Sequence, residues 1–178
     1  MWRVVLFSLA IVYSSPAAAA IGWFFKGQCY DSYLKSGSTN ADLRDFPPDV
    51  IRCEVAVLTE LKNGRKLMNF VSGRGVLGFS GSVIGPLPNR NTLGIPIDRI
   101  YPIRDLGMDA SEILKRASEG EGALKNADGF CFFEPGVNLA KTKNLSCISK
   151  FEDEKRKIVY RVLMKVDHVN RRVMPDPD

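Results

Sequence analysis

Residues 157–168 read KIVYRVLMKVDH, and they carry the clearest secondary-structure pattern in the chain. Every second side chain from Ile158 to Val166 is apolar. The alternate set consists of Lys157, Arg161, Lys165 and Asp167, with Val159 and Leu163 between them. A period of two with one apolar face predicts a β-strand that covers a core on one side only. The alternation places His168 on the apolar side.

Two shorter apolar runs precede this strand. Residues 145–151 and 129–133 have strand-like composition, and the polar segment 151–156 connects the first of them to the final strand. We therefore expect 145–151 and 157–168 to pair as antiparallel neighbours. Near the other end of the chain, the aromatic run 21–25 predicts a first strand packed into the core.

The middle of the chain has mixed signals. Residues 50–61 fit either a helix capped by Asp49 or the first strand of a hairpin that turns at Asn63-Gly64. We favour the hairpin, because Asn-Gly suits a type I′ turn in which both residues have positive φ. Residues 95–103 read as an edge or irregular strand because Pro96 and Pro102 interrupt them.

One helix is predicted, and it is short. Asp109-Ala110-Ser111-Glu112 resembles a capping box, apolar side chains follow at helical spacing up to Ala117, and Gly120 and Gly122 end the pattern. The expected fold class is therefore α+β: an antiparallel sheet with one or two short helices, stabilised by disulfides. The alternative is an all-β barrel or sandwich.

The first twenty residues predict export. Arg3 precedes an apolar run, 4–13, a Ser-Ser-Pro break follows, and 17–20 are alanines that suit a signal peptidase. We expect cleavage after Ala20, which leaves 21–178 as a single exported domain in the periplasm or outside the cell. The alternative is an uncleaved N-terminal membrane anchor, since residues 4–25 carry no charge. Both alternatives place the domain outside the cytoplasm.

Four cysteines fit that location. Cys29, Cys53, Cys131 and Cys147 are an even number in an exported chain, which is typical of disulfides. We favour Cys29–Cys53 and Cys131–Cys147, because short loops close most readily. A zinc site is the alternative, but the cysteines lack Cys-x-x-Cys spacing and the chain has one histidine. No metal or cofactor is expected.

Positive charge gathers near the C-terminus. Residues 141–172 hold ten Lys and Arg against four Asp and Glu. Such a face either keeps the protein soluble or contacts an anionic envelope component or an acidic protein. Nucleic acid is not expected as a partner. The predicted binding residues are Lys157, Arg161, Lys165, Arg171 and Arg172, which Lys141, Lys143 and Lys150 would flank.

Catalytic motifs are incomplete. Residues 73–78 spell G-x-G-x-x-G, but the glycines at 81 and 85 exclude the helix that a dinucleotide site needs. Ser80 lacks the second glycine of a nucleophile elbow, because residue 82 is serine. His168 as a general base would have no free thiol beside it. The remaining candidates are scattered carboxylates: Asp98, Asp105, Asp109, Glu112 and Glu134.

The sequence therefore predicts a protein that acts by binding through its basic strand face. The first alternative is a small envelope hydrolase that uses loop carboxylates, with or without His168, in a concave pocket. The second alternative is an inhibitor of an exported enzyme that presents the loop 85–91.

Overall fold

The computed structural model describes residues 21–40, 42–61, 63–72, 75–86, 92–104, 119–136 and 138–173. Two short 3-10 helices are present, η1 (Leu43–Asp45) and η2 (Leu139–Lys141). The strands are β1 Ile21–Ser38, β2 Asp49–Val50, β3 Val55–Glu60, β4 Lys66–Ser72, β5 Gly75–Gly81, β6 Gly85–Pro86, β7 Leu93–Arg104, β8 Leu124–Glu134, β9 Asn144–Glu152 and β10 Arg156–Val173.

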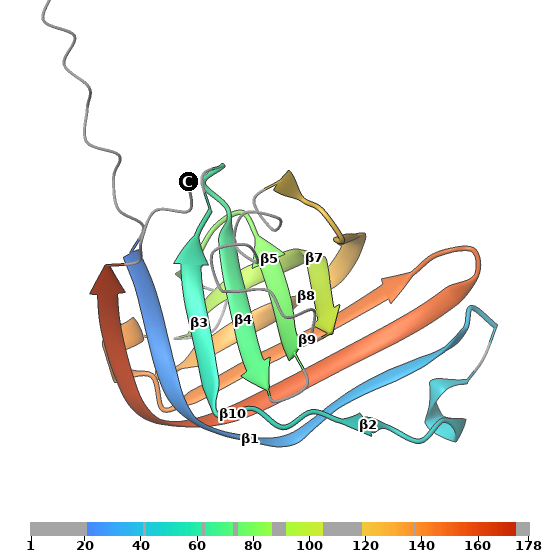
Figure 1. Ribbon diagram of the computed structural model, residues 1–178, viewed down its shortest axis with the longest axis horizontal. Coiled ribbons are helices and arrows are strands. Elements are labelled where there is room, and N and C mark those ends of the chain that lie inside the picture. The colour runs from blue at the N-terminus through green and yellow to red at the C-terminus, as the bar shows by residue number, and fades with distance from the viewer. Residues whose placement is uncertain are drawn as a thin grey trace, which may run out of the picture.

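Eight of these ten strands form one closed antiparallel barrel (Figure 1). The hydrogen-bonded order is β10-β9-β8-β7-β5-β4-β3-β1, and β10 also pairs with β1 to close the ring. The short strands β2 and β6 pair with β1 and β7 outside this ring. Neighbours in space are thus neighbours along the chain, except at the seam that joins the first long strand to the last.

The α+β prediction is wrong, and the alternative with an all-β barrel is the correct class. The described residues contain no helix of seven residues or more. The predicted helix at Asp109–Ala117 lies outside the described residues. Alternation along one strand shows that one face is buried, but it does not distinguish an open sheet covered by helices from a sheet that curls round to cover itself.

The inner face of the barrel is an aromatic core. Phe79 lies edge-on to Phe70 and to Tyr160, with ring centroids 5.9 and 6.2 Å apart, and Phe25 packs against Phe133 at 5.9 Å. The alternation predicted for β10 is confirmed, since Ile158 to Val166 are buried at every second position. Phe25, in the predicted first strand, is also buried. Because the inner face is occupied by the core, binding chemistry has to be sought on the outer face.

Residues 95–103 were predicted as an edge or an irregular strand. Strand β7 has a neighbour on each side, so the edge alternative is wrong, whereas the register shift between Ile97 and Arg99 confirms the irregular one. It pairs with β5 through residues 99–104 and with β8 through 93–100. Pro102 lies beyond the β8 pairing and Pro96 lies beyond the β5 pairing. Each proline therefore sits where β7 pairs with one long strand only, and a proline is tolerated there because the other side of the strand has no long ladder that needs its N–H.

The predicted hairpin at Asn63-Gly64 is confirmed, with a different turn. β3 and β4 pair throughout, the Gly64 N–H donates to the Leu61 carbonyl at 2.8 Å, and the Leu61 N–H donates to that of Arg65. Gly64 has a φ of +77°. These bonds describe a turn followed by a glycine bulge, which is the usual alternative to the two-residue type I′ turn.

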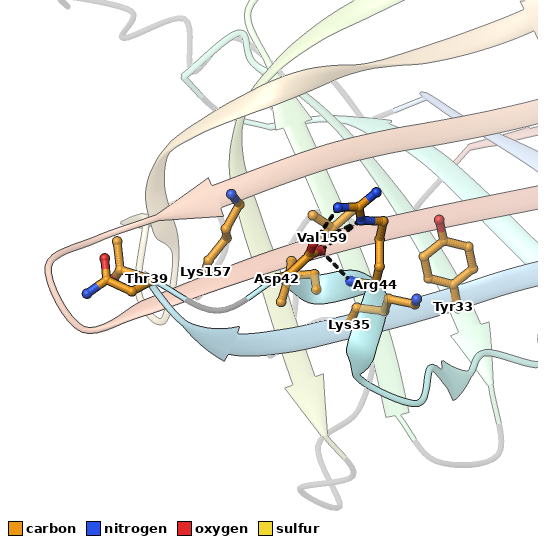
Figure 2. A pocket seen from close by; sticks show the side chains of 9 residues that line it. Tyr33, Lys35, Thr39, Asp42, Arg44, Lys157 and Val159 are labelled. Atoms are coloured by element: carbon orange, nitrogen blue, oxygen red, sulfur yellow. Dashed lines mark hydrogen bonds and ion pairs between the residues drawn. The ribbon is translucent and has the colours of Figure 1, made fainter.

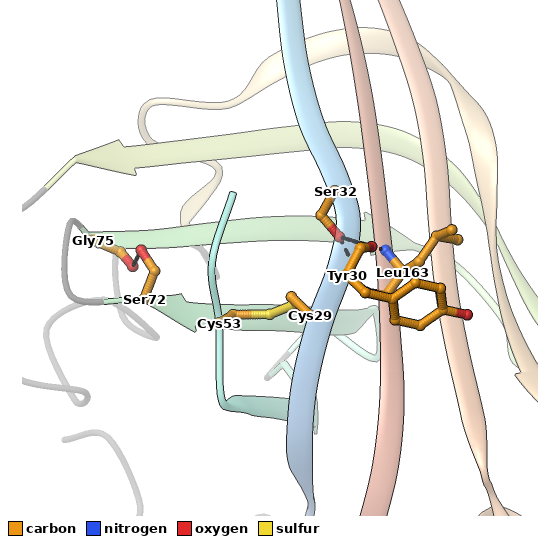
Figure 3. Close-up of a disulfide and its surroundings, with 7 residues drawn as sticks. All are labelled: Cys29, Tyr30, Ser32, Cys53, Ser72, Gly75 and Leu163. Atoms are coloured by element: carbon orange, nitrogen blue, oxygen red, sulfur yellow. Dashed lines mark hydrogen bonds between the residues drawn. A yellow bond between two sulfur atoms is a disulfide. The ribbon is translucent and has the colours of Figure 1, made fainter. Parts of the chain in front are cut away.

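A β-bulge interrupts the seam between β1 and β10. Tyr30 pairs with Leu163 and Tyr33 with Arg161, so β1 carries one extra residue there, and Asp31 has a φ of +43°. The buried Ser32 side chain replaces the lost backbone pairing (Figure 3). The Leu163 N–H donates to Ser32 Oγ at 2.8 Å, and the hydroxyl donates to the carbonyls of Tyr30 and Leu163 at 2.9 and 3.1 Å.

We expect Ser32→Ala to destabilise the barrel by about 1–3 kcal/mol, because the Leu163 N–H would remain buried without an acceptor. Urea unfolding followed by tryptophan fluorescence measures the loss. Ser36→Ala is the matched control, since Ser36 is an exposed serine on the same strand. Equal stability of the two variants would show that the hydroxyl does not hold the bulge.

Candidate functional site: a basic pocket on the outer face

Beyond the bulge, β1 and β10 run on together as an arm that extends past the barrel, beside β9 (Figure 1). Bulges bend strands and increase their twist, so the extra residue at Asp31–Ser32 marks the point where the arm departs. The arm consists of residues 33–38 of β1 and 156–161 of β10. After β1 ends, the chain turns back through η1 alongside the arm.

A pocket of about 580 Å³ lies between this arm and the returning segment (Figure 2). Its walls come from β1, from β10, and from the stretch that leads into η1. The lining residues are Tyr33, Lys35, Thr39, Asn40, Asp42, Leu43, Arg44, Lys157 and Val159. Three of these side chains are cationic and one is a carboxylate.

Strand register brings two of the cations together. Lys35 of β1 lies directly opposite Val159 of β10, and Lys157 is two residues before Val159. Directly opposed residues of an antiparallel pair share a face, and diagonal neighbours lie about 7–8 Å apart, within reach of long side chains. Lys35 and Lys157 therefore project from the same outer face, although 122 positions separate them in the sequence.

The third cation is held by the returning segment. Asp42 caps η1 by accepting the Arg44 N–H at 2.9 Å, and the same carboxylate accepts Arg44 Nε at 2.9 Å and Nη2 at 2.6 Å. The hydrogen bonds from Arg44 hold the pKa of Asp42 below its usual value, and the charges of Lys157 and Lys35 add to this effect. Asp42 thus stays ionised and fixes the position of Arg44.

The lysines have weak partners. Lys157 lies 3.8 Å from Glu152 in a solvent-exposed ion pair, a type that contributes little to stability. Lys35 lies 6.0 Å from the centre of the Tyr33 ring, and no carboxylate among the described residues forms an ion pair with it. Both ammonium groups are therefore available to an incoming anion.

The structure brings three of the five predicted binding residues onto one face. Lys157, Arg161 and Lys165 all point outward from β10, as the alternation predicted. Arg161 pairs with Asp31 of the bulge at 3.1 Å. Lys165 is exposed between Gln28 of β1 and Asn144 of β9.

Arg171 and Arg172 lie apart from the other three. They occupy the far end of β10, about 45 Å along the strand from Lys157 at the usual rise per residue. Their guanidinium groups lie over aromatic rings of β1, at 5.7 Å from Trp23 and 5.6 Å from Phe24. Of the three predicted flanking lysines, Lys150 shares the outer face next to Val159 and pairs with Asp128 at 3.2 Å.

Sequence reasoning missed the other half of the pocket. Tyr33, Lys35, Asp42 and Arg44 lie between the predicted first strand, 21–25, and the ambiguous segment 50–61, in a part of the chain for which the sequence predicted no role in binding. Asp42-Leu43-Arg44 does carry a signal, because aspartate is a preferred helix N-cap. Nothing in the sequence indicates that this turn faces Lys157, since the contact depends on closure of the barrel.

The position of His168 differs from the prediction. His168 pairs with Lys26 while Val166 pairs with Gly27, so Asp167 is an extra residue in β10. This second bulge shifts the alternation by one residue, which turns His168 outward and Val169 toward Phe25. His168 is exposed. A strict period of two fails wherever a strand takes in an unpaired residue.

The other catalytic candidates are dispersed. Residues 75–78 of the G-x-G-x-x-G motif lie in strand β5. Ser80, on the same strand, is buried and accepts a hydrogen bond from Arg65 Nε at 3.2 Å. Asp98, on β7, forms an ion pair with Arg65. Glu134 is exposed at the end of β8. Asp105, Asp109, Glu112 and part of the loop 85–91 lie outside the described residues.

Two disulfides link the chain as favoured from the sequence. Cys29 of β1 is joined to Cys53, which precedes β3, and Cys131 of β8 is joined to Cys147 of β9. All four thiols are therefore in disulfides. These bonds are consistent with an exported protein, because they form and persist in oxidising compartments.

Within the described ranges, no three or more His, Cys, Asp and Glu side chains gather as a metal site would require. No helix in that part of the chain has the length and apolar character to cross a membrane. Comparison with protein-family models, with curated proteins and with solved structures gives no match to this chain.

Proposed function

We propose that this protein is an exported binding protein that takes up an anionic group of an envelope component in the pocket between the arm and η1. The observation that carries this proposal is the convergence of Lys35, Arg44 and Lys157 around one open pocket. Asp42 offsets one of these charges, so the pocket keeps a net charge of about +2. Phosphate and carboxylate groups are the anions that such side chains bind.

Several features favour binding over catalysis. The pocket contains one carboxylate, and that group is occupied by Arg44. Asp98, Glu134 and His168, the described members of the hydrolase hypothesis, lie on three different strands. The proposed site also differs from the one first predicted: Lys35 and Arg44 join Lys157 in the pocket, whereas the other four predicted residues, Arg161, Lys165, Arg171 and Arg172, do not line it.

The test is a titration of the disulfide-bonded protein with glycerol 3-phosphate and, separately, with citrate. Both are followed by amide chemical shifts in two-dimensional NMR. We expect shifts to concentrate at Tyr33, Arg44 and Val159, and binding to weaken as salt is added. Lys35→Glu with Lys157→Glu should raise the dissociation constant at least tenfold. Asp42→Asn should lower it several-fold, because Arg44 would lose its competing carboxylate.

Arg171→Glu with Arg172→Glu is the matched control. It changes the net charge of the protein by the same amount, but at the far end of β10. Because screening limits such charges to about 10 Å at 0.1 M salt, this variant should bind both anions as the unmodified protein does. If both pairs weakened binding equally, the attraction would be to overall charge and the pocket assignment would be wrong.

A further inference from the structure

Beside the basic pocket, the outer face carries apolar side chains in two adjacent rows that cross the strands. Pro96, Phe130, Ile148, Arg161 and Tyr33 lie opposite one another on β7, β8, β9, β10 and β1. In the next row, Phe132, Ser146, Leu163 and Tyr30 lie opposite one another. We call six of these residues the outer apolar patch: Tyr30, Pro96, Phe130, Phe132, Ile148 and Leu163.

Four of the six patch residues are exposed to solvent, and Phe132 and Leu163 are half-buried. The exposed fractions are 40% for Phe130, 46% for Ile148 and 50% for Tyr30. The rings of Phe130 and Phe132 stack with centroids 5.9 Å apart. Their neighbours Cys131 and Phe133 face the core and are fully buried, so β8 is apolar on both faces here. A strand of a small soluble barrel needs one apolar face, and a second, exposed one indicates an interaction surface.

Cations surround and enter the patch. Where β9 and β10 pair, over residues 144–152 and 157–165, the outward cations Lys150, Lys157, Arg161 and Lys165 stand against one carboxylate, Glu152. Arg161 lies within the first row, between Ile148 and Tyr33. The ion pairs with Asp31, Asp128 and Glu152 are at the surface, where such pairs are weak enough to exchange for another anion.

We infer that the outer apolar patch docks this protein on an anionic phospholipid surface. The inference rests on the proposed function, and it names the source of the anion that the pocket takes up as a lipid headgroup. Aromatic and aliphatic side chains would enter the interface while the lysines remain at headgroup level. Tyrosine is well suited to that boundary, since its ring is apolar and its hydroxyl is polar.

Charge favours a membrane over a second copy of the chain. Two copies joined through this face by a twofold axis would bring Lys150, Arg161 and Lys165 of one subunit close to the same cations of the other. Such like-charge contacts oppose association. A bilayer that contains phosphatidylglycerol supplies the opposite charge over the whole face.

The experiment measures co-sedimentation of the exported, disulfide-bonded protein with vesicles. One set contains phosphatidylglycerol and phosphatidylethanolamine, and the other contains phosphatidylcholine alone. We expect binding to the first set, with partitioning at least tenfold weaker to the second. Phe130→Ser with Ile148→Ser should lower partitioning to the anionic vesicles by tenfold or more, because both side chains would lose apolar burial. The glycerol 3-phosphate titration of this variant should be unchanged.

Val71→Ser is the matched control. Val71 is 40% exposed, and its strand β4 lies diametrically opposite β9 in the ring, so this variant should partition as the unmodified protein does. Full vesicle binding by the Phe130/Ile148 variant would overturn docking and leave the pocket proposal standing. Dimerisation of the unmodified protein through these residues, without sedimentation with vesicles, would also overturn docking and leave the pocket proposal standing. Failure of the soluble anion to bind would overturn the pocket proposal itself.

Discussion

Replacement of Gly27 by alanine is expected to destabilise the protein by about 3 kcal/mol or more. Gly27 lies on β1 at the second bulge, opposite Val166 of β10. A Cβ at this position would lie 1.9 Å from the carbonyl oxygen of Lys165 and 3.0 Å from the Cα of Val166. Both contacts are with backbone, so no side chain can move aside, and the two strands that close the barrel would have to separate.

Gly85→Ala is the control for this substitution. Gly85 lies on the short strand β6, and a Cβ there would meet nothing within 4 Å. The stability of the Gly85→Ala variant should be unchanged or slightly raised, because alanine loses less conformational entropy on folding than glycine does. Thermal and urea unfolding of both variants measure the difference in stability between them. A Gly27 variant as stable as the Gly85 variant would mean that the seam has more space than the structure shows.

Local patterns predicted much of the fold correctly. The period of two from Lys157 to Val166 predicts the inner and outer faces of β10, and Asn63-Gly64 predicts the hairpin of β3 and β4. Each of these features depends on residues within one strand or one turn. The local information was sufficient there because side chains alternate along a strand whatever it pairs with.

Features that depend on distant pairing could not be predicted. Closure of the barrel joins Ile21 to Val173 at one end of the seam and Ser38 to Arg156 at the other. No local pattern indicates this pairing, so an antiparallel sheet with one or two short helices was favoured and the barrel was only the alternative. No sequence pattern indicates the bulge at Asp167 either, and this bulge changes the face on which His168 lies.

The same limit explains why half of the candidate site was missed. Lys157 was identified from its own strand, whereas Lys35 enters the pocket through the register between the first and last strands. Arg44 enters because the chain doubles back after β1. A binding site assembled across the seam of a barrel is therefore recognisable only after the seam is known.

Reduction of both disulfides is the second change with a large expected effect. Cys29–Cys53 and Cys131–Cys147 have sequence separations of 24 and 16, and loops of this size contribute about 3 kcal/mol each by restricting the unfolded chain. Their sum approaches the total stability of a typical small domain, which is about 5–15 kcal/mol. The reduced protein should therefore be largely unfolded or unfold at much lower urea concentrations.

Urea unfolding with and without a reductant, with thiols counted by mass under each condition, measures this effect. Each of the double variants, Cys29→Ala with Cys53→Ala and Cys131→Ala with Cys147→Ala, should lose about half of the unfolding free energy that reduction of both disulfides removes. An unfolding midpoint that stays constant after all four thiols are shown to be reduced would contradict the prediction. It would also show that strand pairing and the aromatic core hold the barrel together without the disulfides, so that the fold would not depend on an oxidising compartment.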